Sequence, residues 1–576
     1  MAKRDIRFAT PKAPREQQVL FPQYLDDAVA PDAPVRTFVE LMGQCDWTTW
    51  EQAYEGYGQP PIHPRYLASA ILYGLMHKVR STRELEAAAC NRLDFIWMLE
   101  GFTPDHSTFA DFRLRHAKGI EDLQKHIAKE LVTRRETELL LLLIDGTRMR
   151  ADSDWHGARA AEYIAKIICE LDRRMEEMLR NSRPEPPQTD FFEGMAPDAD
   201  DLQKLAHLDE QIARLQKQRD KYQKALDTAR RRDERAQRHD GKNAKPVRVP
   251  VTDPDSHVLP NKEGGYAPNY TPIAAVEPQT GAIVHASVLD GSDEASAVLP
   301  AVEALEALAG QPVDGVLADG NFPAGEVLEA LDAQGIKAYM PIRTASPADN
   351  PALRPDPTLP VAEQDLERLP RHGGHFARSA FVYDPQADTY YCPMGHTLTP
   401  FKRGNNKDGV PCTYYQCKHC PGCSLTKRCI KGKDPCRSIT RDRHEPLREA
   451  TIQRMATSGG QAVYKKRAPY MEGAFAGIKS GLGIRRFTVR GLDKVRIEWN
   501  WICAAYNLKK LLACQARSAL KGHRPGVNPS PSPRKRRFAC LRPHYGASCV
   551  QATCHWILRS LSITGHSQNV QIPGAA

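Results

Sequence analysis

The fold of this 576-residue chain is decided by the stretch Leu139-Leu140-Leu141-Leu142-Leu143-Ile144-Asp145-Gly146-Thr147. Six apolar residues run directly into an aspartate, and a glycine follows. A continuous apolar run of this length, ended by turn residues, predicts a strand that is buried on both faces. A lone buried carboxylate is costly unless a cation or hydrogen bonds compensate it. Asp145 is therefore either a strand-end cap or a metal ligand, depending on whether other carboxylates converge on it.

A second strand of the same kind lies far downstream. Residues 312–320 form a short apolar stretch that again ends in aspartate and glycine, at Asp319 and Gly320. Around it the pattern predicts strands at 273–276, 282–289 and 336–342 and helices at 292–308 and 325–334. The predicted order is strand, insert, strand, strand, helix, strand, helix, strand. It indicates an α/β core in which Asp145 ends the first strand and Asp319 ends the fourth.

The segment before this core is predicted to be helical. Apolar residues recur every three or four positions from Tyr66 to Leu75, and Ser81-Thr82-Arg83-Glu84 has the form of a capping box. Asp105 to Thr108 offers N-caps for a further helix. Several short helices with interleaved Arg and Lys fit a helix-turn-helix-like DNA-binding unit. Spacing alone favours an ordinary helical bundle, since such bundles host many functions.

A helical insertion is predicted at about 155–240. It carries an apolar seam at Leu202, Leu205, Leu208, Ile212 and Leu215, typical of a coiled coil or a helical hairpin. A proline-rich break at 183–187 separates two arms. The remaining surface is charged, which usually marks a solvated face. Oligomerisation and DNA clamping are both open as roles of this arm.

Composition restricts the class of protein only loosely. The net charge is +10, from 80 Lys and Arg against 70 Asp and Glu. This mild excess fits either a basic soluble protein or one with a polyanionic partner, most often nucleic acid. The sequence contains no run of about 18 apolar residues, so we expect no membrane-spanning segment.

The cysteines are unevenly distributed. Seven of the 15 lie between Cys392 and Cys436, and such clustering in a large chain favours a metal site over a disulfide framework. The overlapping Cys-x2-Cys pairs of Cys417, Cys420 and Cys423 suit tetrahedral zinc. The alternative is a set of free buried thiols. Further candidate ligands in the cluster are Cys412, Cys429, Cys436 and His396.

Two strand-end aspartates with a glutamate on a later helix can hold two divalent cations for phosphodiester chemistry. Hard oxygen ligands of this kind fit Mg²⁺ or Mn²⁺. The best third acid is Glu472, which on a helix shares one side with Phe475 and Lys479. Taken alone, this stretch is better explained as a charged helix surface. The rival acids rank lower, because they lie in loops or away from a strand end: Asp152, Asp154, Asp253, Asp255, Asp314 and Glu498.

The spacing Tyr464-x2-Arg467-x4-Glu472-x6-Lys479 resembles the signature around the catalytic glutamate of DDE transposases from bacterial insertion sequences. Residues 143–147 resemble the first catalytic strand of that family. Residues 316–322 resemble the second, although family members usually read Ala-Asp-x-Gly-Tyr where this chain has Ala-Asp-Gly-Asn-Phe. Further similar motifs, in the family's order, are 81–85, 104–113, 252–255 and 264–266. The resemblance spans roughly residues 20–515.

The resemblance implies a fold and a set of site residues. The fold is α/β, a ribonuclease-H-like mixed sheet core with a helical N-terminal domain, a helical insertion and a small cysteine-rich insertion. The implied catalytic residues and ligands of a two-metal Mg²⁺ or Mn²⁺ site are Asp145, Asp319 and Glu472. The implied DNA contacts are Tyr464, Arg467 and Lys479. Similar transposases carry Cys-Pro-x-Gly followed by Cys-x2-Cys-x5-Cys, which selects Cys392, Cys420, Cys423 and Cys429 as ligands of a structural zinc.

The implied function is a transposase that binds the terminal inverted repeats of its element, cleaves the DNA ends and transfers the strands. Its expected partner is double-stranded DNA, bound by at least a homodimer in the bacterial cytoplasm at the nucleoid. Open alternatives are a transposase-derived DNA-binding protein, a metal-dependent nuclease without strand transfer, a zinc-ribbon interaction protein and an inactive copy. The expected divisions are 1–62, 63–135 (DNA-binding helices), 136–154 with 246–343 (core), 155–245 (helical insertion), 344–443 (linker and cysteine-rich insertion), 444–515 (core helices) and 516–576 (poorly ordered tail).

Overall fold

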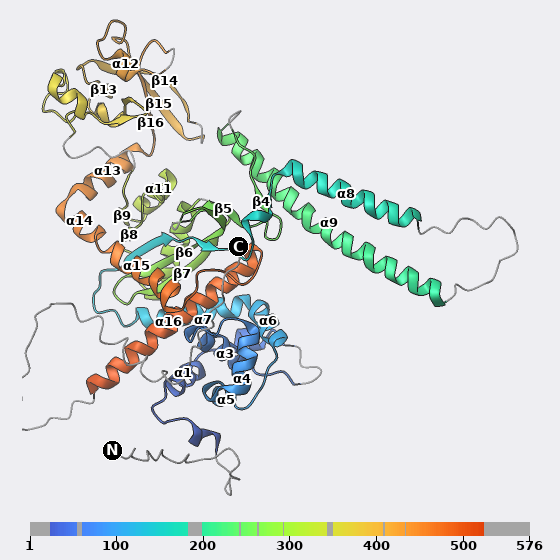
Figure 1. Cartoon of the computed structure of the whole chain (residues 1–576). Coiled ribbons are helices and arrows are strands. Elements are labelled where there is room, and N and C mark those ends of the chain that lie inside the picture. Colours follow the sequence, from blue (N-terminus) through green and yellow to red (C-terminus); the bar gives the residue numbers. More distant parts are fainter. Residues whose placement is uncertain are drawn as a thin grey trace, which may run out of the picture. The chain divides into compact units, whose positions relative to one another are not determined.

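The computed structural model describes residues 24–54, 60–181, 199–240, 244–261, 264–291, 293–342, 350–406, 409–431 and 434–522 (Figure 1). Its central element is a mixed sheet with the strand order β7-β6-β1-β8-β9. These strands are β1 (Leu141–Gly146), β6 (Tyr266–Glu277), β7 (Ala282–Leu289), β8 (Gly315–Leu317) and β9 (Lys337–Tyr339). β1 runs antiparallel to β6 and parallel to β8. The predicted α/β fold of ribonuclease-H-like type is confirmed, and so is the predicted order of its elements.

Short elements extend this core. β2 (Met149–Arg150) and β5 (His257–Pro260) also pair with β6, and β3 (Ala158–Arg159) pairs with β4 (Val249–Pro250). The core helices are α7 (Ala117–Val132), α10 (Val298–Ala309), α11 (Gly325–Ala333), α13 (Glu445–Ala456), α14 (Ser458–Tyr464), α15 (Arg467–Ala476) and α16 (Leu492–Gly522). A π-helical turn, η7 (Gly477–Gly481), continues α15. No helix in the described part of the chain is long and apolar enough to cross a membrane.

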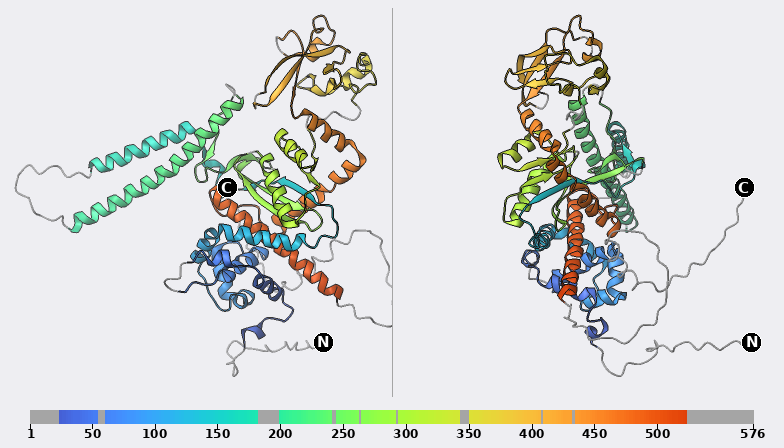
Figure 2. Two further views of the ribbon diagram at one scale, coloured as in Figure 1. Left: turned by 180° about the vertical axis from the view of Figure 1, so that it is seen from behind. Right: turned by 90° about the vertical axis from the view of Figure 1, so that its left-hand side faces the viewer.

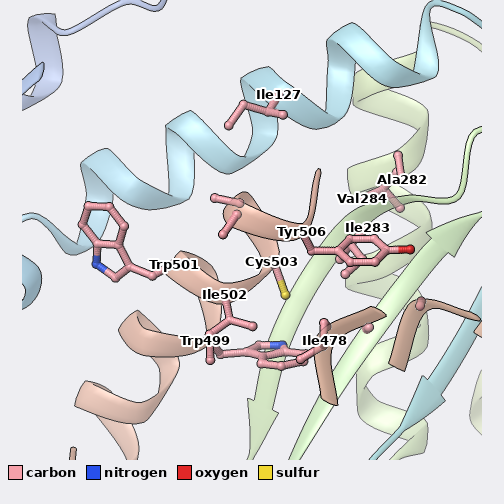
Figure 3. Packing of buried hydrophobic residues seen from close by; sticks show 14 of the residues in the cluster. Ile127, Ala282, Ile283, Val284, Ile478, Trp499, Trp501, Ile502, Cys503 and Tyr506 are labelled. Atoms are coloured by element: carbon pink, nitrogen blue, oxygen red, sulfur yellow. The ribbon is translucent and has the colours of Figure 1, made fainter. Parts of the chain in front are cut away.

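The C-terminal helix α16 and α7 both pack on β7: Gln124 of α7 donates a hydrogen bond to Ile283 O (2.8 Å), the residue that α16 also contacts. Figure 3 shows Trp499, Ile502 and Tyr506 of α16 among side chains of α7 and β7. Asn507 is fully buried, and its amide accepts a hydrogen bond from Ile283 N (2.9 Å) and donates one to Ile283 O (2.8 Å). Buried polar groups need such partners, so Asn507 fixes the register of α16 on the sheet.

In the described residues before the core, a 3-10 helix, η1 (Leu25–Ala28), is followed by six α-helices. They are α1 (Pro34–Gly43), α2 (Thr48–Glu51), α3 (Pro64–Met76), α4 (Thr82–Asn91), α5 (Leu93–Met98) and α6 (His106–Arg115). The predicted capping box of Ser81 and Glu84 is confirmed, with both of its hydrogen bonds present. Asp105 caps α6 by accepting a hydrogen bond from Thr108 N (2.7 Å). The starts of both helices therefore follow from local sequence.

Two arginines join these helices to the C-terminal segment. Arg113 of α6 lies 3.2 Å from the Glu498 carboxylate of α16, and both side chains are buried. Arg80 donates hydrogen bonds to the carbonyl oxygens of Gly483 (2.9 Å) and Arg486 (3.0 Å). Both arginines are therefore engaged in internal contacts, whereas a DNA-binding interpretation of these helices would use them as surface cations.

The predicted helical insertion is a hairpin. Its helices α8 (Ala161–Asn181) and α9 (Ala199–Asp240) lie side by side in all three views (Figures 1 and 2). In α9 the predicted seam residues Leu208, Ile212 and Leu215 are half-buried. The proline-rich break at 183–187 lies outside the described residues.

The loop after β4 joins this hairpin to α16. Arg232 of α9 donates to the carbonyl oxygens of Asp255 and Ser256, at 2.9 Å each. The Asp253 and Asp255 carboxylates accept hydrogen bonds from the backbone N–H of Gly491 (3.0 Å) and Leu492 (3.1 Å). The first N–H groups of a helix lack intrahelical partners, so these two acids cap α16 rather than only forming a turn.

The cysteine-rich insertion has its own small core. Its five-stranded antiparallel sheet contains β12 (Val382–Asp384), β13 (Thr389–Tyr391), β14 (Thr397–Asn405), β15 (Pro411–Cys417) and β16 (Ser438–Asp442). Outside this sheet, the insertion also contains the two-stranded pair of β10 (Arg371–His372) and β11 (His375–Phe376), and the helix α12 (Thr426–Cys429). The tail predicted to be poorly ordered, 516–576, begins within α16, which is helical as far as Gly522, and residues 523–576 lie outside the described residues.

Candidate active site

The two predicted aspartates occupy equivalent positions on neighbouring strands. Leu143 of β1 pairs with Leu317 of β8, so Asp145 and Asp319 each follow that pair by two residues. Adjacent strands lie about 4.8 Å apart, and the carboxyl ends of parallel strands meet at one edge of a sheet. Both aspartates are half-buried. The prediction that they end neighbouring strands is confirmed.

Arg467, the first residue of α15, contacts the first of these acids. Its Nη2 lies 2.8 Å from Asp145 Oδ2, and the two side chains are only 17% and 22% exposed. A pair this sheltered is screened less by salt than a surface pair. The Tyr464 hydroxyl lies near this ion pair. Burial raises the pKa of Tyr464, Arg467 lowers it, and the charges of Asp319 and Asp145 raise it further.

Lys479 reaches the turn that follows β1. Its Nζ donates hydrogen bonds to Thr147 Oγ1 (2.7 Å) and to Arg148 O (3.0 Å). Lys479 lies in the π-helical turn η7, and such widened turns occur frequently at functional sites. A Cβ added at Gly477, where η7 begins, would lie 2.6 Å from the ring of Tyr506. Glycine is therefore needed for η7 to rest against α16.

Glu472 is not gathered with the other predicted residues. The buried side of α15 is formed by Met471 and Ala474, and Arg467 lies on that side, four residues before Met471. Glu472 follows Met471 by one residue, which is about 100° around the helix, and its side chain is exposed. Among the described residues no three His, Cys, Asp or Glu side chains are placed to hold a metal. The catalytic role of Glu472 stays a prediction.

A different glutamate lies beside the aspartates. Glu294 precedes α10, and its Oε1 would be 3.0 Å from a Cβ added at Gly146, so glycine after Asp145 leaves room for it. Asn321 joins it to the second strand end: its side chain hydrogen-bonds Glu294, and its backbone N–H donates to Asp319 Oδ1 (2.8 Å). Burial raises the pKa of Glu294, and the charges of Asp319 and Asp145 raise it further. No motif pointed to Glu294, although Asn321 stands where this chain departs from the usual family pattern.

The oxygen donors at the strand ends suit a hard divalent cation. Asp145, Asp319 and Glu294 offer carboxylates only, the ligands that Mg²⁺ and Mn²⁺ prefer. In this structure the guanidinium of Arg467 is the positive charge beside Asp145. A bound cation would compete with this guanidinium for the Asp145 carboxylate. The ligand types therefore suit a divalent cation, but the described side chains are not arranged as a metal site.

The predicted zinc ligands lie around one small pocket in the cysteine-rich insertion. The pocket is lined by Cys392, Cys420, Cys423 and Cys429, and also by Cys417, His396 and His419. A hydrogen bond from the Cys417 thiol is the main cause that lowers the pKa of Cys392 to about 6. Cys412 and Cys436, the other candidates, do not line this pocket.

Two family models match the chain. A model described as transposase DDE domain matches residues 391–512, which include the cysteine-rich cluster, α15 and most of α16. A model described as transposase domain (DUF772) matches residues 23–115, the N-terminal helices. Asp145 and Asp319 lie outside both matches. Comparison with curated proteins finds no match to the chain.

Proposed function

We propose that the chain is a DDE transposase of an insertion sequence, because two transposase family models match parts of it, and that it cuts the DNA ends of its own element and joins them to a target. One observation carries this proposal. The Asp145–Arg467 ion pair brings the helix of the matched DDE domain onto a strand end 322 residues earlier in the chain, beside Asp319. A carboxylate pair with adjacent cations suits chemistry on phosphodiesters.

In the proposed reaction Asp145 and Asp319 hold Mg²⁺ or Mn²⁺, and Glu472 provides the third carboxylate. Cations held by these carboxylates would supply activation of the attacking oxygen and stabilisation of the leaving one. Because Glu472 is exposed, α15 must turn to bring it to the aspartates. Such a turn would release Arg467 from Asp145, and the freed guanidinium could then hold a DNA phosphate. Lys479 and Tyr464 would contact the same strand.

The proposed chemistry consists of two displacements at phosphorus. In the first, a water oxygen attacks the phosphodiester at the element end, and the bond to the 3′ oxygen breaks to leave a 3′-hydroxyl. In the second, that hydroxyl attacks a phosphodiester of the target, the bond from its phosphorus to the target's 3′ oxygen breaks to leave a target 3′-hydroxyl, and the new bond joins element to target. We propose that the N-terminal helices bind the terminal inverted repeats. We further propose that at least two protomers act together on DNA at the bacterial nucleoid, since two ends are cut.

The test is the substitution Asp145→Asn, assayed for cleavage of DNA that carries the element's ends in the presence of Mn²⁺. Loss of a metal-binding carboxylate should lower the cleavage rate by about 10³-fold or more, since even weaker disturbances of metal sites cost about 10–100-fold. Asp154→Asn, an exposed acid nine residues later, is the matched control and should cleave normally. Full activity of Asp145→Asn would refute the proposal. Cleavage without joined products in the wild type would instead favour a nuclease.

We also propose a structural zinc held by Cys392, Cys420, Cys423 and Cys429. The pocket that they share supports this proposal, while no three of the described side chains yet stand at metal-binding distance from one another. A zinc-thiolate site would stabilise a unit too small for a large core. Cys420→Ser should reduce bound zinc from about one ion per chain to almost none, measured by elemental analysis of the purified chain. Cys412→Ser, also buried but outside the pocket, should retain the metal. Equal zinc content in both variants would contradict this ligand set.

A further inference from the structure

The cysteine-rich module, residues 371–443, carries an unusual charge. It contains 13 Lys and Arg against 5 Asp and no Glu, a net charge of +8 where the whole chain has +10. Much of this excess is not neutralised within the fold. Five exposed cations of the module form no salt bridge with any residue that the structure describes: Lys402, Arg403, Lys418, Lys427 and Lys431.

Two of these cations lie on the ribbon formed by β14 and β15 (Figure 1). Residues 400–403 are all exposed, although neighbouring side chains of a strand point to opposite faces, so this part of the ribbon is not packed on either side. A β-bulge between Pro400 and Lys402 makes Phe401 the extra residue, and its side chain is 49% exposed. Bulges of this kind re-aim side chains.

An aromatic pair lies next to the two cations. The ring of Phe401 is 6.4 Å from that of Tyr414 across the ribbon, in an edge-to-face arrangement. Lys402 Nζ lies 5.9 Å from the Tyr414 ring centroid, and Arg403 is paired with Thr413 one residue along. An exposed Phe401 ring beside a half-buried Tyr414 ring, flanked by cations without salt-bridge partners, matches a polyanion whose flat bases can stack on the exposed ring.

We propose that the β14–β15 ribbon binds DNA, with Lys402 and Arg403 on phosphates and Phe401 against a base that is unpaired at the cut end. A two-stranded ribbon is narrow enough to enter the major groove, which is about 12 Å wide. Stacking on an aromatic ring requires a base that has left the duplex stack. This inference rests on the proposed function and assigns it a DNA-contact surface apart from the strand-end aspartates.

The test measures binding of the full-length Lys402→Ala/Arg403→Ala variant to a fluorescent duplex carrying the element's end, by anisotropy at several salt concentrations. Loss of two phosphate contacts should reduce the slope of log K against log salt by about 1.8. Affinity at a fixed moderate salt concentration should fall roughly tenfold. Phe401→Ala should bind the paired duplex normally but lose roughly fivefold or more on a duplex with unpaired end bases.

Arg371→Ala is the matched control, because it removes one charge from the same module at a side chain already paired with Glu367. Its salt slope should stay within about 0.3 of the wild type. The exchange variant Lys402→Arg/Arg403→Lys keeps both charges and should bind DNA as the wild type does. It therefore separates the effect of lost charge from any misfolding of the alanine variant. An unchanged slope and affinity in an alanine variant that retains its melting temperature would overturn the proposal. Since binding is measured without cleavage, a failure of the proposed catalysis is detected separately.

Discussion

Replacing Arg113 by alanine is expected to lower the free energy of unfolding by about 3–5 kcal/mol. The substitution leaves the Glu498 carboxylate, which is 4% exposed, without its guanidinium partner. An unpaired buried charge is far more costly than the loss of the pair itself. Glu498 would still accept hydrogen bonds from Thr488 N (2.9 Å) and Thr488 Oγ1 (2.6 Å), which keep the expected loss within that range. Urea unfolding followed by tryptophan fluorescence measures the change, since Trp50 and Trp501 meet at this junction.

Arg115→Ala is the matched control for this prediction. Arg115 lies on the same helix, two residues further, and is exposed, so its loss should change stability by no more than about 0.5 kcal/mol. The double variant Arg113→Met/Glu498→Gln removes both charges, keeps an acceptor for Thr488 N and Oγ1, and should recover much of the loss. Equal destabilisation by Arg113→Ala and Arg115→Ala would show that the buried pair is not what joins α6 to α16.

The second large effect concerns the choice between two glutamates. Glu472→Gln is expected to lower the rate of end cleavage by about 10³-fold or more, as loss of a metal-binding carboxylate should. Glu294→Gln is expected to cost only about tenfold, because Glu294 acts through its hydrogen bond with Asn321, whose backbone N–H donates to Asp319. Single-turnover cleavage of end DNA, with saturating protein and Mn²⁺, measures both rates.

The reverse ranking would change the assignment of the triad. Glu294 lies beside Asp145 and Asp319 in this structure, whereas Glu472 is exposed on α15. A loss of about 10³-fold in Glu294→Gln with normal cleavage by Glu472→Gln would make Glu294 the third acid. Both substitutions keep the size and shape of the side chain and remove only its charge. The cleavage rate of each variant can therefore be compared with that of the wild type once their melting temperatures are shown to be equal.

The sheet could be predicted from sequence because its signals are local. A buried strand of a parallel pair has to be apolar along its whole length, and the Asp-Gly that ends it marks the point where the backbone leaves the core. Asp145 and Asp319 were found this way, and their equivalent positions follow from the register of β1 and β8. The start of α4 was equally readable, since a capping box uses only residues three apart.

The rest of the site depends on contacts between residues far apart in the chain. Glu294 has no motif, and only the folded loop places it against Gly146. The spacing predicts Glu472 and Lys479 on one side of a regular helix, but Lys479 lies in the π-helical turn η7 and contacts the turn after β1, whereas Glu472 is exposed. The sequence around Arg113 does not show whether its side chain contacts DNA or a buried glutamate, so composition alone could not distinguish a DNA-binding arginine from one in a buried ion pair.

The contact between Arg113 and Glu498 cannot form until the ribosome has synthesised nearly the whole described chain. The two residues are 385 positions apart, and at roughly 5–20 residues per second their synthesis is separated by about 20–80 seconds. During that interval Trp50 and Phe112 have been made but Trp501, which will cover them, has not. The N-terminal helices therefore leave the ribosome with an open apolar face and must be kept from aggregating until the last helix arrives. Slower growth at low temperature, or abundant chaperones, should accordingly raise the yield of soluble protein.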